Sequence, residues 1–398
     1  MIDLKAARSD PGSWRAALAR KGAAEEFDAL LEADGRWREL VPKVDELRGR
    51  TKLKGKPTPE QLEELRPVKS ALKEAEQELA SAESARDAAL ALVPNPPDAS
   101  APDGDTEEDA EELRVVGAPP ELAEPREHTE IGRFDMERAA RMSGARFGFV
   151  IGDSARVAMA LYQFALDHLA REGFTPVLPP VLVREEAMYG TGFFPTDRSN
   201  IYGLEADGLF LTGTSEVALA ALHMGEILEQ LPLRYPGFST CFRREAGAAG
   251  KDTRGMFRVH QFNKVEMFVF VDPDTSLDEH ERMLELEERF LQTLELPYRV
   301  MNVAAGDLGA SATKKYDIEA WFPFQERYRE VTSCSNTTDY QSRRLGIRFR
   351  GEHGLEHPHT LNGTMVTDRA LLAILENFQG GVPEVLMQYG APSVVRPS

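Results

Sequence analysis

The sequence predicts an α+β fold, in which an N-terminal antiparallel α-helical coiled-coil hairpin precedes a domain with an antiparallel β-sheet flanked by helices. Apolar residues recur at heptad spacing near the N-terminus, which favours a pair of packed helices. Farther along, apolar stretches typical of strands alternate with stretches of helical spacing, as in an α+β domain. We expect a helical domain at residues 1–100 with its hairpin at about 36–93, an acidic linker at 101–129 and a larger domain at 130–398.

The composition limits the class of protein. The 398 residues, 42% of them hydrophobic, are enough for two or three domains with packed cores. There is no apolar run long enough to span a membrane, and the N-terminus lacks the apolar stretch of a secretory signal, so we expect a cytoplasmic protein. The two cysteines, Cys241 and Cys334, are too few for a disulfide framework and make a poor zinc site, so no zinc is expected.

Charge is unevenly distributed along the chain. The net charge of -19 argues against a nonspecific nucleic-acid binder. Residues 103–112 hold seven acids and no base, whereas residues 48–56 hold five bases and no acid. Because acidic and basic residues are gathered in separate patches, the net charge does not decide which class of molecule the protein binds.

The predicted hairpin has two apolar runs with steps of three and four residues. They comprise Trp37, Leu40, Val44 and Leu47 in the first run and Leu65, Val68, Leu72, Ala75, Leu79 and Ala82 in the second. Thr58 is placed as an N-cap, Pro59 as the first helical residue and Gln61 as the capping-box partner. Pro42 and Pro67 lie inside the runs at similar distances from the turn, so we expect a bend at one level of the hairpin.

Five bases gather at the predicted tip of the hairpin: Arg48, Arg50, Lys52, Lys54 and Lys56. Heptads alone favour a packing or dimerisation module, and such a charge run is most often a solvated turn. An RNA-binding tip is the alternative, and the rest of the chain favours it.

The larger domain contains a segment that predicts a polar binding site. A strand ends near Arg243, a loop of small residues carries Lys251 and Arg254, and a second strand returns toward Glu266. Alternation puts five side chains on one side of that strand, namely Arg258, His260, Phe262, Lys264 and Glu266. Cations can meet phosphates there and an aromatic ring can meet a base, although a salt-bridged hairpin is the competing interpretation.

Three further segments carry candidate ligand-binding groups. Glu330 and Ser333 offer the hard oxygen ligands that Mg²⁺ prefers. A strand near 359–364 leads through a small-residue turn into a helix with Arg369 near its start, which favours an anion. Hydroxyls and Glu216 at the start of another helix could hold a small zwitterion, with the carboxylate facing an ammonium, or could be a simple helix cap.

Taken together, these segments resemble the bacterial seryl-tRNA synthetases, a family of class II aminoacyl-tRNA synthetases, over essentially the whole chain. The hairpin resembles the tRNA-binding arm of that family. GFTPVLPPVL, FRREAGAAGKDTRGMFRVHQFNKVE and NGTMVTDRALLAILEN resemble class II motifs 1, 2 and 3, and GDLGASATKKYDIEAW and SCSN strengthen the likeness. Motif 3 has one residue fewer than usual between Thr364 and Arg369, and the sequence alone does not place that arginine.

The resemblance implies ATP-dependent activation of L-serine to seryl-adenylate and transfer of serine to tRNA(Ser), and to tRNA(Sec) where it exists, by a homodimer that uses Mg²⁺. The implied catalytic residue is Arg243. The implied serine-binding residues are Thr214, Glu216, Arg243, Glu266 and Thr364. The implied ATP-binding residues are Arg243, Arg244, Glu245, Arg258, Val259, Phe262, Glu330, Val331, Thr332, Ser333 and Arg369. The implied Mg²⁺ ligands are Glu330 and Ser333, and the implied tRNA contacts are the five tip bases.

Two other functions stay open at this point. One is a synthetase-like enzyme that activates an amino acid for an acceptor outside translation, but carrier-protein loaders related to this family lack the arm. The other is a non-catalytic tRNA-binding paralogue, which would be expected to have lost ATP-site residues such as Arg243, Glu245, Phe262 and Glu330.

Overall fold

The computed structural model describes residues 1–52, 58–247, 250, 252, 255–352 and 354–396. The chain divides into two compact units, Met1–Pro96 and Pro97–Ser398. The first consists of helices and the second combines helices with an antiparallel sheet, so the predicted α+β class is confirmed. The second unit starts well before the predicted residue 130.

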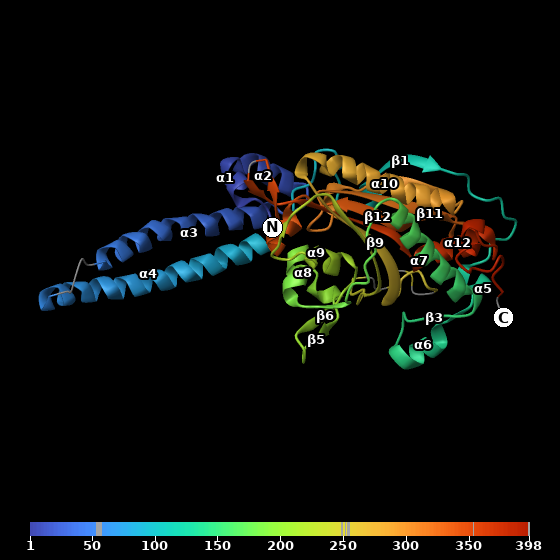
Figure 1. Ribbon diagram of the computed structural model, residues 1–398, viewed down its shortest axis with the longest axis horizontal. Coiled ribbons are helices and arrows are strands. Elements are labelled where there is room, and N and C mark those ends of the chain that lie inside the picture. Colours follow the sequence, from blue (N-terminus) through green and yellow to red (C-terminus); the bar gives the residue numbers. More distant parts are fainter. Residues whose placement is uncertain (53–57, 248–249, 251, 253–254, 353, 397–398) are drawn as a thin grey trace. The chain divides into compact units, whose positions relative to one another are not determined.

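The N-terminal unit is built around a helical hairpin. Its helices are α1 (Leu4–Ser9), α2 (Pro11–Ala19), α3 (Ala24–Thr51) and α4 (Pro59–Leu92). Helices α3 and α4 run side by side along the hairpin (Figure 1). The predicted capping box is confirmed, because the backbone N–H of Gln61 donates to Thr58 Oγ1 at 3.3 Å and the N–H of Thr58 donates to Gln61 Oε1 at 3.0 Å.

The apolar runs form the contact between the two helices. The side chains of Leu40, Val44 and Leu65 are buried, and Ala75 and Ala82 are buried farther along α4. Helix α3 begins at Ala24, earlier than the predicted start of the hairpin at about residue 36, because the sequence before the heptad run also has helical spacing.

Pro42 and Pro67 do not end either helix. Both lie inside the helix assigned to them, and both are exposed. A proline has no N–H, so the carbonyl four residues earlier in the helix loses its usual donor. On the solvent side water can bond that carbonyl, which is why the helix can continue past the proline.

The second unit is organised around one sheet. Within the described part of the chain, seven strands run in the order β1-β10-β11-β12-β15-β9-β8, and every neighbouring pair is antiparallel. The strands are β1 (Glu111–Val116), β8 (Leu233–Phe242), β9 (Gln261–Val271), β10 (Tyr298–Asn302), β11 (Lys314–Phe322), β12 (Arg327–Asn336) and β15 (His359–Thr367).

The predicted linker at 101–129 is wrong in part, because it contains strand β1. This strand pairs with β10, and Arg114 on it donates from Nε to Glu288 Oε1 at 2.9 Å. All but the last of its residues are exposed, so it lacks the apolar alternation by which a strand is recognised in a sequence.

Three long helices cover one face of the sheet: α7 (Asp153–Arg171), α10 (Ser276–Thr293) and α12 (Asp368–Phe378) (Figure 1). The side chains of β9 alternate between the two faces. Val265, Met267 and Val269 join the core with these helices. Lys264 and Glu266 point to the opposite face.

Smaller elements surround the sheet. The short strands are β2 (Phe134–Asp135), β3 (Phe149–Val150), β4 (Leu182–Val183), β5 (Gly203–Leu204), β6 (Leu209–Leu211), β7 (Ile227–Leu228), β13 (Arg348–Gly351) and β14 (Gly354–Glu356). The short helices are α5 (His128–Ile131), α6 (Met136–Ser143), α8 (Glu185–Thr191), α9 (Glu216–Ala221), α11 (Tyr340–Leu345) and α13 (Glu384–Met387).

A carboxyl group lies buried beneath the sheet on α10. Glu287 has no exposed surface, and a Cβ added to Gly363 would lie 2.9 Å from its Oε1. Burial raises the pKa of Glu287 well above its usual range, and the charges of Glu266 and Asp317 raise it further. The folded protein therefore holds a proton that the unfolded chain releases above its own pKa of about 4.3.

We predict that Glu287→Gln becomes more stable than the wild type as pH rises. The native-state pKa of Glu287 is raised, so the stability that this group contributes is fully present below about pH 4.3 and falls by up to about 1.4 kcal/mol per pH unit above it. The glutamine variant does not titrate at this position, so it does not lose this part of the free energy of unfolding as pH rises. Urea unfolding of both proteins between pH 5 and 8 measures the difference. Glu285→Gln, at an exposed position of the same helix, is the control, and curves for Glu287→Gln that stay parallel to the wild type would contradict the prediction.

Candidate active site

A cavity of about 500 Å³ opens on the sheet face that carries Lys264 and Glu266. Residues from β9, β12 and β15 line it, together with residues just beyond the end of β8. The opposite face of the same strands packs against α7, α10 and α12. The alternation of side chains along the strands therefore separates a polar chamber from the apolar core.

Most of the predicted serine- and ATP-binding residues line this one cavity. They are Thr214, Glu216, Arg243, Glu245, Arg258, Val259, Phe262, Glu266, Glu330, Val331, Thr332, Ser333, Thr364 and Arg369. They come from segments far apart in the sequence, which the antiparallel sheet brings together.

Two residues of the predicted site are not among the lining residues: Arg244, which is expected to bind ATP, and His260, which is expected on the polar face of the strand. Arg244 lies with its guanidinium 5.5 Å from the centroid of the Tyr202 ring. His260 lies before the first residue of β9, and its Nδ1 is 2.8 Å from the backbone oxygen of Arg243. The strand starts at Gln261, so strand alternation does not extend back to His260 or Arg258. Arg258 nevertheless lines the cavity. Lys251 and Arg254 lie outside the described residues.

Arg243 follows directly after the last residue of β8. Its Nε donates to the backbone oxygen of Gly213 at 3.2 Å, and its guanidinium lies 5.2 Å from the centroid of the Phe262 ring. Its charge lowers the pKa of both Glu216 and Glu330, although it is not the largest influence on either. The arginine is thus within electrostatic reach of two separate polar clusters.

The first cluster surrounds Glu216 at the start of α9. Glu216 Oε1 accepts hydrogen bonds from Gln341 Nε2 at 2.7 Å and from Asn362 Nδ2 at 3.0 Å. Burial, together with the charge of Glu266, raises the pKa of Glu216 to about 7. The Ser215 side chain makes no capping hydrogen bond, but Thr214 Oγ1 accepts one from the backbone N–H of Glu216 at 3.2 Å. A hydroxyl of this segment therefore bonds the start of α9, as the competing interpretation expects, and the Glu216 carboxylate also lines the cavity.

An ion pair on β9 lies beside this cluster. Lys264 and Glu266 are two positions apart on the same face of the strand, both are buried, and their side chains are joined directly. Lys264 Nζ also donates to Thr364 Oγ1 at 3.4 Å. The lysine balances a carboxylate that would otherwise be costly to bury.

The second cluster surrounds Glu330 on β12. Its Oε2 accepts from Arg369 Nη1 at 2.9 Å. Burial in the cavity opposes ionisation, but the charges of Arg369 and Lys315 outweigh it and lower the pKa of Glu330 to about 2. Glu330 and Ser333 both line the cavity and offer the hard oxygen ligands that Mg²⁺ prefers. Among the described residues, no group of three acids, histidines or cysteines lies together as a metal site.

Arg369 lies in the cavity despite the short spacing that precedes it. The predicted small-residue turn is wrong, because β15 runs through Asn362 and Thr364 without a break. Its pairing with β9 instead shifts register between Thr364 and Val366. Arg369 is the second residue of α12, so the irregularity in the strand is followed directly by the helix that carries the arginine.

Phe257 is a cavity residue that sequence reasoning missed. The guanidinium of Arg329 lies 3.7 Å from the centroid of its ring and that of Arg369 lies 4.6 Å from it. Glu245 and Arg258, two of the implied ATP-binding residues, form an ion pair with each other, with Oε2 and Nη1 2.7 Å apart. Lys315 and Asn362 also line the cavity. The sequence segments that contain Lys315 and Asn362 were noted above, but no periodicity marks either residue as part of a site.

At the hairpin tip, the structure describes three of the five predicted bases. Arg48 pairs with Glu76 across the hairpin, with Nη2 and Oε1 3.0 Å apart, while Arg50 and Lys52 are exposed. Lys54 and Lys56 lie outside the described residues. Arg48 therefore already has a partner within the arm.

The antiparallel sheet has an arginine directly after β8, an aromatic and a carboxylate on β9, and a second arginine at the start of α12, the helix that follows β15. Together these features define the catalytic core of a class II aminoacyl-tRNA synthetase. In agreement, residues 202–378 match the tRNA synthetase class II core domain (G, H, P, S and T), and residues 1–97 match the seryl-tRNA synthetase N-terminal domain. The serine–tRNA ligase of Acidothermus cellulolyticus is 47% identical, and that of Mycolicibacterium vanbaalenii is 46% identical, each alignment covering 100% of both chains. The chain belongs to the seryl-tRNA synthetase family.

Solved structures agree with this assignment. A seryl-tRNA synthetase from Pyrococcus horikoshii, crystallised with ATP, is 38% identical with a TM-score of 0.93, and the match covers 100% of both chains. A cytoplasmic serine–tRNA ligase from Naegleria fowleri, in complex with AMP, is 33% identical with a TM-score of 0.88, covering 98% of this chain and 96% of that one. Among the helices in the described ranges, none is long and apolar enough to cross a bilayer.

Proposed function

We propose that the chain is a serine–tRNA ligase, which activates L-serine with ATP to seryl-adenylate and transfers the serine to the 3′ end of tRNA(Ser), and of tRNA(Sec) where a cell has one. The observation that carries the proposal is a single cavity in which Arg243 acts on two clusters, one of buried carboxylates around Glu216 and one of arginines around Glu330. The carboxylate cluster suits a small zwitterion, and the arginine cluster suits a nucleoside triphosphate. We expect the reaction to take place in the cytoplasm.

The carboxylate cluster is proposed to bind serine. Glu216 and Thr214 would hold the ammonium, and Glu266 and Thr364 would lie near the hydroxyl. Glu266 is already paired with Lys264, which occupies one of its oxygens. A site that hydrogen-bonds a substrate hydroxyl rejects an analogue without it by about 10⁴-fold or more, so alanine would be excluded.

The arginine cluster is proposed to bind ATP. Phe262 would stack on the adenine, Arg369 would cover its other side, and Glu245 would accept a hydrogen bond from the adenine edge. Arg258 would meet the terminal phosphates. Because Glu245 and Arg258 are paired with each other in the chain, ATP would have to replace this ion pair with its own contacts to both.

The chemistry of the first step is proposed to depend on positioning and charge. An oxygen of the serine carboxylate attacks the α-phosphorus, and pyrophosphate leaves. Arg243, within reach of both clusters, would bridge the serine carboxylate and the α-phosphate and stabilise the negative charge of the transition state. Glu330 and Ser333 would hold Mg²⁺, which supplies further charge neutralisation when bound. No protein nucleophile is required.

We predict serine-dependent exchange of pyrophosphate into ATP by the wild type, and charging of tRNA(Ser) but not of other tRNAs. Arg243→Ala should lose about 10²–10³ in exchange rate, the usual cost of removing a transition-state contact, with an unchanged unfolding temperature. Arg244→Ala is the matched control, because Arg244 is the next residue in the chain and does not line the cavity. Exchange within a few-fold of the wild type in Arg243→Ala, or exchange supported equally by alanine, would refute the proposal.

We predict that the KM for serine falls as pH rises from 6 to 8. The pKa of Glu216 is about 7, and an ammonium binds the ionised form, so below that pH each unit should raise KM by up to about tenfold. Glu216→Gln should have a higher KM that no longer changes in this way. The KM for ATP, measured in the same reactions, serves as the control. A wild-type KM for serine that is flat across this range would rule out the assigned contact.

The helical arm is proposed to bind tRNA through its tip. Arg50 and Lys52 are exposed there, and contacts from such side chains to phosphates dominate the recognition of helical RNA. Arg48, paired with Glu76, is proposed to act partly by holding the two helices together.

Replacing both Arg50 and Lys52 by alanine should raise the KM for tRNA(Ser) and leave adenylate formation unchanged. Each lost phosphate contact should reduce the slope of log affinity against log salt by about one. Arg66→Ala, at an exposed position of α4, is the control. If tRNA affinity and its salt dependence are the same in all three proteins, the tip is not the contact.

We also propose that the protein is a homodimer joined through the segment that resembles motif 1. Leu178 in that segment is 80% exposed and Leu182 is 39% exposed in the single chain. Apolar side chains of this size are costly to leave in water. Light scattering at micromolar concentration should give a mass of two chains, and Leu178→Asp should shift it toward one. A wild-type mass of a single chain would contradict the proposal.

A further inference from the structure

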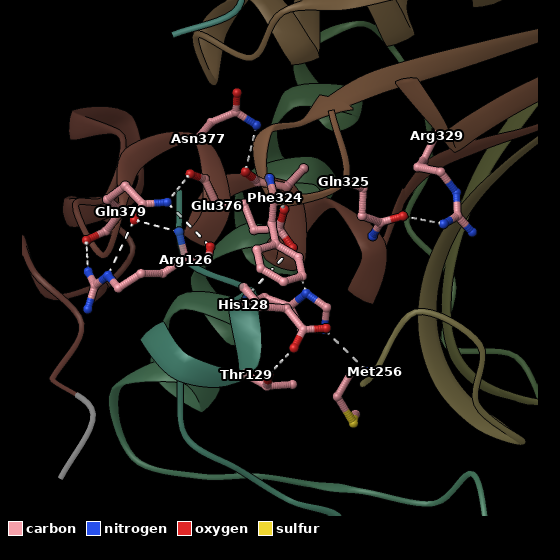
Figure 2. Close-up of polar contacts among 12 residues, drawn as sticks. Arg126, His128, Thr129, Met256, Phe324, Gln325, Arg329, Glu376, Asn377 and Gln379 are labelled. Atoms are coloured by element: carbon pink, nitrogen blue, oxygen red, sulfur yellow. Dashed lines mark hydrogen bonds and ion pairs between the residues drawn. The ribbon is translucent and has the colours of Figure 1, made fainter. Parts of the chain in front are cut away.

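A buried polar cluster joins three distant segments beside the cavity (Figure 2). His128 is the first residue of α5, Glu376 lies in the last half of α12, and Met256 lies where the motif 2 loop returns toward β9. His128 is 1% exposed and Glu376 is not exposed at all. None of these residues belongs to the predicted serine or ATP contacts.

The Glu376 carboxylate is held by three donors. His128 Nδ1 is 2.7 Å from Oε1, the backbone N–H of His128 donates to the same oxygen at 3.4 Å, and the backbone N–H of Phe324 donates to Oε2 at 3.3 Å. A buried carboxylate needs such donors, because without them its desolvation is not compensated.

The other ring nitrogen of His128 contacts the motif 2 loop. The backbone N–H of Met256 donates to Nε2 at 3.3 Å, so Nε2 is an acceptor. The hydrogen of the neutral ring is then on Nδ1, which donates a hydrogen bond to Glu376. The preceding residue, Gly255, has a φ of +72°, and a Cβ added there would lie 2.8 Å from Nε2. The backbone of the loop therefore rests directly on the imidazole.

This contact leads straight to the cavity wall. Met256 and Phe257 both line the cavity, and the guanidinium groups of Arg329 and Arg369 lie 3.7 Å and 4.6 Å from the centroid of the Phe257 ring. Arg369 and Glu376 are on the same helix, about two turns apart. The start of α12 thus carries Arg369, which lies against Phe257 in the motif 2 loop. The end of α12 carries Glu376, which holds the same loop through His128.

We propose that His128 and Glu376 are positioning residues for the ATP end of the cavity. They fix the return of the motif 2 loop relative to α12, so that Phe257 and Arg369 are in place before ATP binds. The inference rests on the proposed function for its kinetic consequence, but the contact itself can be tested without any substrate.

Two substitutions of His128 separate positioning from a merely structural role. The side-chain amide of asparagine lies near the place of Nδ1, so His128→Asn keeps a donor to Glu376 and loses the acceptor for Met256. Glutamine reaches the place of Nε2, so His128→Gln keeps an acceptor for Met256 and loses the donor to Glu376. The control is His357→Asn, since His357 bonds the backbone oxygen of Ile347 through Nδ1 at 2.8 Å and does not line the cavity.

For His128→Asn we expect faster hydrogen–deuterium exchange in peptides covering residues 255–262, measured without substrates, and an unfolding temperature close to that of the wild type. The KM for ATP should rise about five- to tenfold, the effect of one lost hydrogen bond, while the KM for serine stays within twofold. His128→Gln should show the reverse pattern, with a lower unfolding temperature and near-normal exchange in those peptides. His357→Asn should leave the exchange and the KM for ATP unchanged.

The proposal is overturned if His128→Asn exchanges and binds ATP like the wild type, or if the asparagine and glutamine variants lose stability and ATP affinity to the same extent. A wild type that fails to activate serine would refute the proposed function instead. The exchange of residues 255–262 would still decide whether His128 holds the loop.

Discussion

The cavity depends on pairs of opposite charges built into single strands. On β9, Lys264 is two positions before Glu266, and on β11, Lys315 is two positions before Asp317, with Nζ and Oδ1 2.8 Å apart. Side chains two positions apart lie on the same face of a strand, so each acid has a lysine of the same strand beside it as a counter-ion. A carboxylate left there without its cation would cost several kcal/mol. These pairs allow one face of the sheet to be both buried and charged.

That polar face requires an apolar one behind it. The helices α7, α10 and α12 cover the reverse of the sheet, and the residues of β9 that alternate with the charged ones, such as Val265 and Met267, pack against them. The strand is therefore fixed from behind by apolar contacts that do not involve the cavity. A rigid backbone of this kind is what allows charges to be held in place before a substrate arrives.

Local features of the fold were predictable from the sequence, and contacts between distant segments were not. The capping box at Thr58 and the helical hairpin follow from short-range patterns. Strand β1 was missed because its residues are almost all exposed and its acids resemble a linker. The family resemblance brought most of the cavity residues together. It gave no hint of the contact between His128 and Glu376, which are 248 positions apart, because no periodicity connects them.

The alternation along β9 has a consequence for how such a protein can change. What the cavity binds is decided at the positions of Lys264 and Glu266, and what keeps the strand folded is decided at Val265, Met267 and Val269. The two sets interleave in the chain but face different neighbours. Mutation can therefore explore new substrates at one set while the other preserves the scaffold, so a single strand can diverge in specificity without first giving up its fold.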